Sequence, residues 1–271
     1  METVGRIKLE SNSFGKRLKS MLKVDFRRMF TMPMLYIMIG VCLAMPILIL
    51  VMTTMMGSTT MADPTTGVET TMDTFTNTWQ AIGSFSSESS GMNMSLTGMC
   101  NINMLYFIIA VFVCLFVAGD FRSGYAKNLF AVRAQKSDYV ISKTLVGFVG
   151  GVGMLLAFFV GAMVGGAVAG LSFDLGAAGV SGLVMCLLSK LFLVGVFVPV
   201  YLLMSVAGKQ KVWFSLILSL CVGMLFFMII PMLTPLDATI LNVFLCLAGS
   251  ALFSAGLGGV SNIVLKKTSL V

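Results

Sequence analysis

Histidine is absent from the 271 residues, and charged residues make up only 11% of the chain. Without imidazole, histidine-dependent zinc sites, haem ligation by histidine and histidine acid–base catalysis are excluded. The six cysteines form no CxxC pair and lie in or beside apolar runs, as small buried hydrophobic residues do. Apolar residues reach 58%, and the mean hydropathy is +0.98. Too little polar surface remains for a water-soluble globule, so the lipid bilayer is the expected solvent.

Apolar runs of membrane-crossing length recur along the chain. They fall at about 33–57, 100–118, 144–170, 178–207, 213–230 and 239–264. In the basic segment before them, apolar residues follow helical spacing from Phe14 to Phe30, as in helices that lie in the membrane interface. The sequence therefore predicts an all-α polytopic membrane protein. Residues 1–32 form an amphipathic N-terminal segment, and residues 33–271 form a domain of six transmembrane helices.

Basic residues are concentrated in alternate loops. The N-terminal segment, the loops 119–143 and 208–211 and the C-terminus hold seventeen of the eighteen Lys and Arg. The other three loops hold six of the eleven Asp and Glu, and no Lys or Arg. Since basic loops stay in the cytoplasm, both termini are expected inside and the loop 58–98 outside. The expected location is the cell membrane, either a bacterial inner membrane or a plasma membrane.

The expected spans lack the groups that power ion-coupled transport. No Asp or Glu lies inside them, which argues against a proton- or sodium-coupled carrier. The chain also has no GxxxxGK[ST] phosphate-binding loop, so it does not bind ATP in that way. We therefore expect a protein that is not an enzyme, holds no metal or cofactor of its own, and takes any energy from a separate ATPase.

The outer loop 58–98 is far longer than the 2–8 residues that usually join two helices. Within it, Phe75, Trp79, Ile82 and Phe85 follow helical spacing. A short amphipathic helix at these positions would cap the outer opening of the bundle or rest on the outer leaflet. The alternative is a flexible linker without a role, and the sequence leaves both interpretations open.

Lys190 is the one charged residue within an apolar run. If the fourth span is a single helix over 178–206, Lys190 lies near mid-membrane at a cost of ~2.5–3.5 kcal/mol. It would then line a pathway or pair at a subunit interface. If the span begins near residue 187, Lys190 instead reaches the outer interface and snorkels.

Glycines four residues apart in the third span let helices approach closely in lipid. The pairs with this spacing are Gly147/Gly151, Gly161/Gly165 and Gly166/Gly170. We expect this span to pack closely, against a partner that the sequence does not identify.

The loop after the second span carries a series of spaced residues. In order they are Asp120, Gly124, Lys127, Leu129/Phe130, Arg133 and Lys143. In this order of acid, glycine, lysine, apolar pair, basic residue and lysine, the chain resembles the type-2 family of ABC transporter permeases. Asp120 replaces the family's glutamate, Tyr125 replaces its threonine, and the proline before the basic residue is missing. The likeness in layout covers nearly the whole chain, whereas the motif covers only residues 119–143.

The resemblance implies that the loop 119–143 contains a short coupling helix that docks on a separate ATP-binding subunit. The residues that it assigns to this coupling are Asp120, Phe121, Arg122, Gly124, Tyr125, Lys127, Leu129 and Arg133. The residue types are compatible, since aromatic side chains can be buried at an interface and basic ones can pair with acids on a partner. The alternative is a solvated loop held by anionic lipid headgroups.

The resemblance also implies partners and a gate. Two permease chains, identical or related, would face each other with the substrate between them. The turn that contains Pro231 and Pro235 would help form an outer gate. ATP and magnesium would be bound by the partner ATP-binding subunits. Membrane lipid is a further expected partner, and nucleic acid is not.

The sequence thus predicts the transmembrane permease subunit of an ATP-driven ABC exporter. Apolar spans rich in Met and Phe suit an amphipathic or hydrophobic substrate, such as a peptide, a lipid or a drug. The alternative is a membrane-embedded immunity, sensor or assembly protein that binds a ligand without moving it. An intramembrane enzyme is disfavoured by the lack of histidine and of carboxylates within the spans.

The distribution of basic residues generates a prediction about topology. Single cysteines introduced at Glu69 or Glu88 should react with a membrane-impermeant maleimide added to intact cells, whereas one at Lys127 should react only after the cells are opened. Seventeen basic residues on the inner side give the physical reason. Reaction at the Glu69 and Glu88 positions only from the cytoplasm would contradict the predicted orientation.

Overall fold

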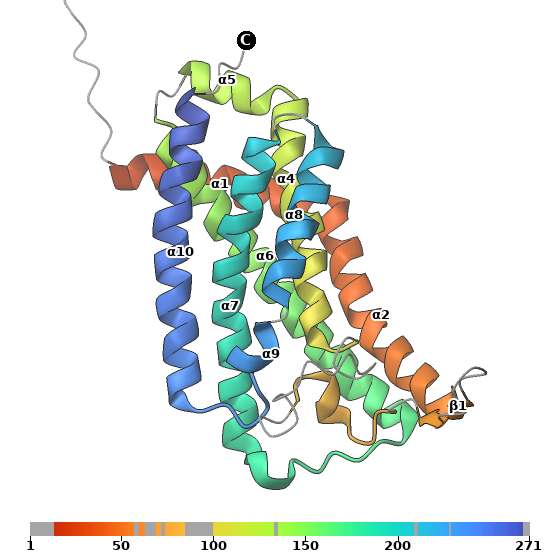
Figure 1. Ribbon diagram of the computed structural model, residues 1–271. Coiled ribbons are helices and arrows are strands. Elements are labelled where there is room, and N and C mark those ends of the chain that lie inside the picture. Colours follow the sequence, from red (N-terminus) through yellow and green to blue (C-terminus); the bar gives the residue numbers. More distant parts are fainter. Residues whose placement is uncertain are drawn as a thin grey trace, which may run out of the picture.

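The computed structural model shows a bundle of long helices (Figure 1). The residues that it describes are 14–56, 60–62, 69–71, 74–84, 100–132, 135–208, 211–227 and 229–267. The long helices are α2 (Pro33–Met56), α4 (Leu105–Arg122), α6 (Lys136–Ala169), α7 (Gly179–Ala207), α8 (Val212–Phe227) and α10 (Ile240–Lys267). The shorter helices are α1 (Phe14–Thr31), α5 (Tyr125–Val132) and α9 (Ile230–Leu233). Single helical turns are η1 (Thr78–Ala81), η2 (Ile102–Met104) and η3 (Gly176–Ala178), and β1 (Thr60–Ala62) pairs antiparallel with β2 (Glu69–Thr71).

Among the described residues, five helical segments are long and apolar enough to cross a membrane: α2, η2 with α4, α6, α7 and α10. Apart from the small hairpin, the chain is a helical polytopic membrane protein, as expected. The fifth expected span is shorter than the others, because α8 ends at Phe227. Pro231 follows four residues later, where its ring would clash with the Phe227 carbonyl in a continuous helix. A sixth crossing and the orientation of the termini remain predictions.

Two helix ends differ from the expected boundaries of the loop 119–143. Helix α4 continues to Arg122, and α6 begins at Lys136 rather than near Thr144. The polar first turns of α6 are stabilised by contacts with other elements, including an Arg17–Asp138 ion pair of 3.2 Å to α1. Gly124 makes the turn from α4 into α5 with a φ of +73°, a conformation that glycine adopts readily.

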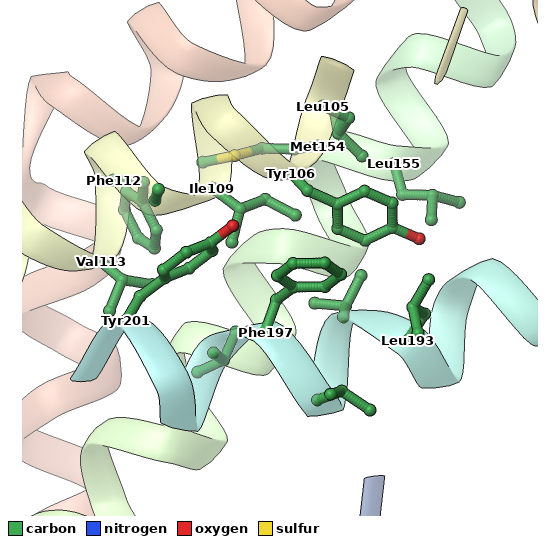
Figure 2. Close-up of a cluster of buried hydrophobic side chains, with 14 of the residues drawn as sticks. Leu105, Tyr106, Ile109, Phe112, Val113, Met154, Leu155, Leu193, Phe197 and Tyr201 are labelled. Carbon is green, nitrogen blue, oxygen red and sulfur yellow. The ribbon is translucent and has the colours of Figure 1, made fainter. Parts of the chain in front are cut away.

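Helix α6 is the centre of the bundle, with α2, α4, α7, α10 and α1 packed around it. Its core contact with α4 and α7 contains a stack of Tyr106 on Phe197, with ring centroids 4.6 Å apart (Figure 2). Met154 and Leu155 of α6 are buried beside this stack. Aromatic and aliphatic side chains from three spans thus fill the middle of the molecule.

The glycine spacing of the third span now has identified partners. A Cβ atom at Gly147 or Gly151 would meet Val198 or Val194 of α7. At Gly161 and Gly165 it would meet the backbone of α2, at Leu43 and Ile47 respectively. The two glycines of the pair Gly166/Gly170 have different roles. Gly166 faces Thr78, and Gly170 ends α6 in the left-handed conformation. Two glycine pairs therefore seat α6 against two different helices.

This packing predicts a difference between two glycines of one helix. Gly161→Ala should lower the free energy of unfolding by about 1–3 kcal/mol, because its methyl group collides with the Leu43 carbonyl group and the backbone has to move. Gly153→Ala should be neutral or stabilising, because no atom lies within 4 Å of the added Cβ. Thermal unfolding of the purified proteins in detergent measures both. Equal losses for the two variants would contradict the close contact of α6 with α2.

Candidate functional site: a buried charge cluster beside helix α5

Helix α1 turns an acidic residue toward the protein. Met21, Asp25 and Met29 are spaced four residues apart, so they lie on one face of the helix, and all three are buried. The opposite face is basic and exposed: it carries Lys16, Lys19, Lys23 and Arg27. Since α1 packs across α6 (Figure 1), the buried face carries the Asp25 carboxylate into the bundle.

Four charged side chains meet at this place. The Lys143 Nζ of α6 lies 2.9 Å from Asp25 Oδ1 and 2.7 Å from Asp120 Oδ2. Arg28 Nη1 of α1 lies 2.8 Å from the other Asp120 oxygen, Oδ1. The side chains of Asp25, Asp120 and Lys143 have no exposed surface, and that of Arg28 is 30% exposed. Two carboxylates and two cations give the charge cluster a formal charge of zero.

Neighbouring polar and aromatic groups complete the charge cluster. Ser142 Oγ donates a hydrogen bond of 2.6 Å to Asp25 Oδ2, and the Tyr139 hydroxyl donates one of 3.0 Å to Asp120 Oδ2. The Lys143 ammonium also lies 4.1 Å from the centre of the Phe116 ring. Buried ions are tolerated only when their remaining hydrogen-bonding capacity is used. Asp25 meets this requirement at both of its oxygens. Asp120 accepts the Tyr139 hydrogen bond at Oδ2, whereas its Oδ1 is an ion-pair partner of Arg28 without a hydrogen bond.

Helix α5 packs directly against the charge cluster. The Arg28 guanidinium lies 4.0 Å from the centre of the Tyr125 ring. Burial raises the pKa of Tyr125, with a further increase from Asp25 and a decrease from Arg28. Burial lowers the pKa of Arg28, but the Asp120 carboxylate and its other neighbours raise it by more, so the net shift is upward. Arg28 therefore remains a cation between the Asp120 carboxylate and the Tyr125 ring.

The predicted coupling residues divide between the interior and the surface. Asp120 belongs to the charge cluster, and Gly124 makes the turn before α5. The rings of Phe121 and Phe130 pack edge-on against Tyr139, at 6.3 and 5.3 Å between centroids. Tyr125 and Leu129 are half-buried, whereas Arg122 and Lys127 are exposed. Arg133 lies outside the described residues.

The aromatic face of this segment is therefore used within the chain. A short helix forms over Tyr125–Val132, as the resemblance implies. Its aromatic side chains contact Arg28 and Tyr139 of the same protein, so the surface left for a partner is basic and polar. Replacing Phe121 or Tyr125 would disturb the chain itself, and a test of docking has to use the exposed residues.

Sequence reasoning did not identify Asp25, Arg28, Tyr139 and Ser142 as members of a site. One signal was available, because Asp25 is the only acid between Phe14 and Phe30. It lies four residues from Met21 and from Met29, on the face that the apolar spacing assigns to the interior. An acid at such a position requires a buried cation as its partner.

A second polar group lies near the other end of the bundle. Helix α7 is continuous from Gly179, and Lys190 within it is only 1% exposed. The interpretation that the span begins near residue 187 and lets Lys190 snorkel is therefore wrong. The Lys190 ammonium points inward because two neutral oxygens accept its hydrogen bonds, Asn103 Oδ1 at 3.0 Å and Thr234 Oγ1 at 2.8 Å.

The turn of the predicted outer gate contacts Lys190 through Thr234, and it is attached to the predicted outer loop through Ser84. Pro231, in α9, is half-buried, and Pro235, in the turn after α9, is buried. Phe75, Trp79 and Ile82 of the outer loop are buried as well. Residues 78–81 form one turn of 3-10 helix rather than a longer amphipathic helix, and Phe85 lies outside the described residues.

Trp79 fixes this segment to α6 and to the residues that follow it. Its indole nitrogen donates a hydrogen bond of 2.9 Å to the Phe173 carbonyl, and its ring stacks on Phe159. For the described residues 74–84, a flexible linker without contacts is therefore wrong. This part of the outer loop covers one end of the bundle.

No protein family model matches the chain, and the searches of curated proteins and of solved structures find no match either.

The geometry of the charge cluster predicts the effect of removing one of its charges. Lys143→Met should reduce the free energy of unfolding by about 3–5 kcal/mol, because two buried carboxylates then share only Arg28. Lys127→Met, at an exposed position on α5, should change it by no more than about 0.5 kcal/mol. Thermal or denaturant unfolding in detergent measures the difference.

A double variant provides the control for this prediction. Asp25→Asn combined with Lys143→Met restores a formal charge of zero and leaves the Arg28–Asp120 pair in place. It should therefore be more stable than Lys143→Met alone. If the double variant loses the sum of the two single losses, Asp25 and Lys143 do not interact and the charge cluster is not formed.

Proposed function

We propose that this chain is the transmembrane permease subunit of an ATP-driven ABC exporter. The observation that carries the proposal is the charge cluster, which joins α1, α4 and α6 beside the short helix α5. A coupling element has to transmit the movement of a soluble ATPase to the membrane helices without deforming. The charge cluster supplies such a connection at the segment in which the sequence resembles type-2 permeases.

The mechanical argument follows from the contacts of α5. One glycine separates α5 from the turn that ends α4, and Asp120 lies in the last turn of α4. Because Asp120 is paired with both Arg28 and Lys143, a displacement of α5 acts on α1 and α6 together. Closure of two partner ATPases on ATP would thus move three helices as one unit and change the access to the space between two permease chains.

The exposed side of α5 indicates the chemistry of the docking partner. Arg122, Lys127 and Asn128 are exposed, and the described part of the segment after Asp120 has no acid before Asp138. A partner groove lined by carboxylates would complement this surface and favour the correct orientation of docking. ATP and magnesium belong to that partner, which supplies the hydrolysis.

The spans favour an amphipathic or hydrophobic substrate such as a peptide, a lipid or a drug. Large apolar side chains are exposed along α8 and α10, including Phe214, Met224 and Phe244. Contact with lipid accounts for most of such surface, and a facing permease chain would cover the remainder. Methionine and phenylalanine form adaptable apolar surfaces that accept ligands of varied shape.

This proposal predicts that an ATP-binding partner dissociates from the chain when the basic residues on the exposed side of α5 are replaced by acidic ones. The tagged full chain is cross-linked mildly in its native membranes, purified, and probed with a photoreactive ATP analogue. A labelled protein should accompany the unaltered chain. Arg122→Glu with Lys127→Glu should reduce its retention about tenfold or more, since like charges then face each other at the docking surface.

The matched control is Lys211→Glu, which reverses an exposed basic residue beside α8 and should retain the partner. Full retention by the double reversal would show that α5 is not the docking element. If no ATP-binding protein accompanies the unaltered chain, the exporter proposal fails. The binding-only alternative, an immunity, sensor or assembly protein, then explains the chain better.

A further inference from the structure

Two segments that are distant in sequence, η2 with α4 and the turn after α9, meet at Lys190 near the end of the bundle opposite to α5. Its ammonium donates to Asn103 of η2 and to Thr234, which follows α9. The carbonyl oxygen of Lys190 accepts a hydrogen bond of 3.0 Å from the Tyr106 hydroxyl of α4. A single residue of α7 therefore contacts the beginning of one span and the turn between two others.

The turn over 230–237 is covered from several sides. The Thr234 hydroxyl accepts from Lys190 and donates to the Ile230 carbonyl at 2.9 Å. The Leu236 amide donates to the Ser84 carbonyl at 2.8 Å, which attaches the turn to the outer loop. Cys186, one helical turn before Lys190, lies beneath the turn, with its sulfur 3.5 Å from the Thr234 carbonyl oxygen.

The two buried lysines differ in what surrounds them. Lys143 lies between two carboxylates, and separating it from them would leave buried charges without partners. Lys190 forms no ion pair with any carboxylate in the described ranges, and both acceptors of its ammonium are neutral oxygens. Moving the turn away breaks the hydrogen bond that Thr234 accepts from Lys190 and the one that Leu236 donates to Ser84, and it lets water reach the ammonium. The contact at Lys190 is therefore suited to opening and closing, whereas the contact at Lys143 is suited to permanence.

We propose that Lys190 is a positioning residue that holds the turn 230–237 closed over α7, and that the turn opens by releasing the Lys190–Thr234 hydrogen bond. The inference deepens the proposed function, because an opened turn would provide the release path for substrate. The acting pair is the Lys190 ammonium and the Thr234 hydroxyl. Asn103 retains the ammonium when the turn has moved away.

Cys186 provides the readout, because it has no exposed surface and lies beneath the closed turn and the adjoining Gly83. A variant that keeps Cys186 and replaces the other five cysteines is purified as the full chain in detergent. The rate of its reaction with a water-soluble maleimide then reports how often the turn opens. In this background, reaction should be slow and should become complete after denaturation.

Two substitutions at Thr234 separate the hydrogen bond from packing. Thr234→Val keeps the shape but removes the acceptor, and it should increase the rate of Cys186 labelling about tenfold or more. Thr234→Ser keeps the hydroxyl while removing a methyl group, and its rate should stay close to that of the unaltered turn. Lys190→Met, which removes the donor, should increase the rate as Thr234→Val does.

A second protein with Cys114 as its single cysteine reports on general loosening. Cys114 is buried between α4 and α8, 3.0 Å from the Ser219 hydroxyl. Its labelling should not change with Thr234→Val. Equal increases at Cys114 and Cys186, or a larger effect of Thr234→Ser than of Thr234→Val, would overturn the proposal.

This experiment needs neither transport nor a partner. If Thr234→Val opens the turn but no ATP-binding protein accompanies the chain, the role of Lys190 stands and the exporter proposal fails. If an ATP-binding protein is present and Cys186 labelling is unchanged in Thr234→Val and in Lys190→Met, the exporter proposal stands and Lys190 does not hold the turn.

Discussion

A charge that leaves water has to be compensated inside the protein, and opposite charges compensate the ammonium of Lys143. Its position between Asp25 and Asp120 connects both α1 and the last turn of α4 to α6. Arg28 pairs with the remaining oxygen of Asp120, and the Tyr125 ring lies against the Arg28 guanidinium. Removing any one of the four ions would leave a buried charge without its partner, so the contacts between these helices depend on all four. Helix α5 packs against this cluster through Tyr125, so its position depends on the cluster being complete.

Hydropathy and residue spacing predicted the features that depend on neighbouring residues in the sequence. The length of apolar runs identified most membrane helices, the apolar period located α1, and glycine spacing indicated close packing of α6. Contacts between distant segments were not accessible in this way. Asp25 and Lys143 are 118 positions apart, and Lys190 and Thr234 are 44 apart, so no local pattern pairs them. A single sequence shows that a buried charge needs a partner, but it does not show which residue the fold brings there.

One physical reason excludes both the snorkelling of Lys190 and a longer amphipathic helix in residues 74–84. An ammonium in lipid has to reach water, but neutral oxygens of η2 and of the turn after α9 replace water here. Similarly, the aromatic residues of 74–84 suggested a helix on a surface, whereas the bundle buries them against α6 and its following residues. In both places the protein interior supplied the surroundings that reasoning about an isolated span assigned to the bilayer or to solvent.

The two ends of the bundle therefore use different chemistry for different mechanical tasks. Near α5, full charges are matched by full charges, and the hydroxyls of Ser142 and Tyr139 leave little freedom for rearrangement. Near the turn 230–237, a full charge is matched by two neutral oxygens, one of which belongs to the element that would move. Helices α4, α6 and α7 connect the ends through a densely packed aromatic core (Figure 2). In an exporter of the proposed kind, a displacement applied at the rigid end would be transmitted through this core. It would act at the opposite end on the Lys190–Thr234 hydrogen bond, which can break without separating two opposite charges.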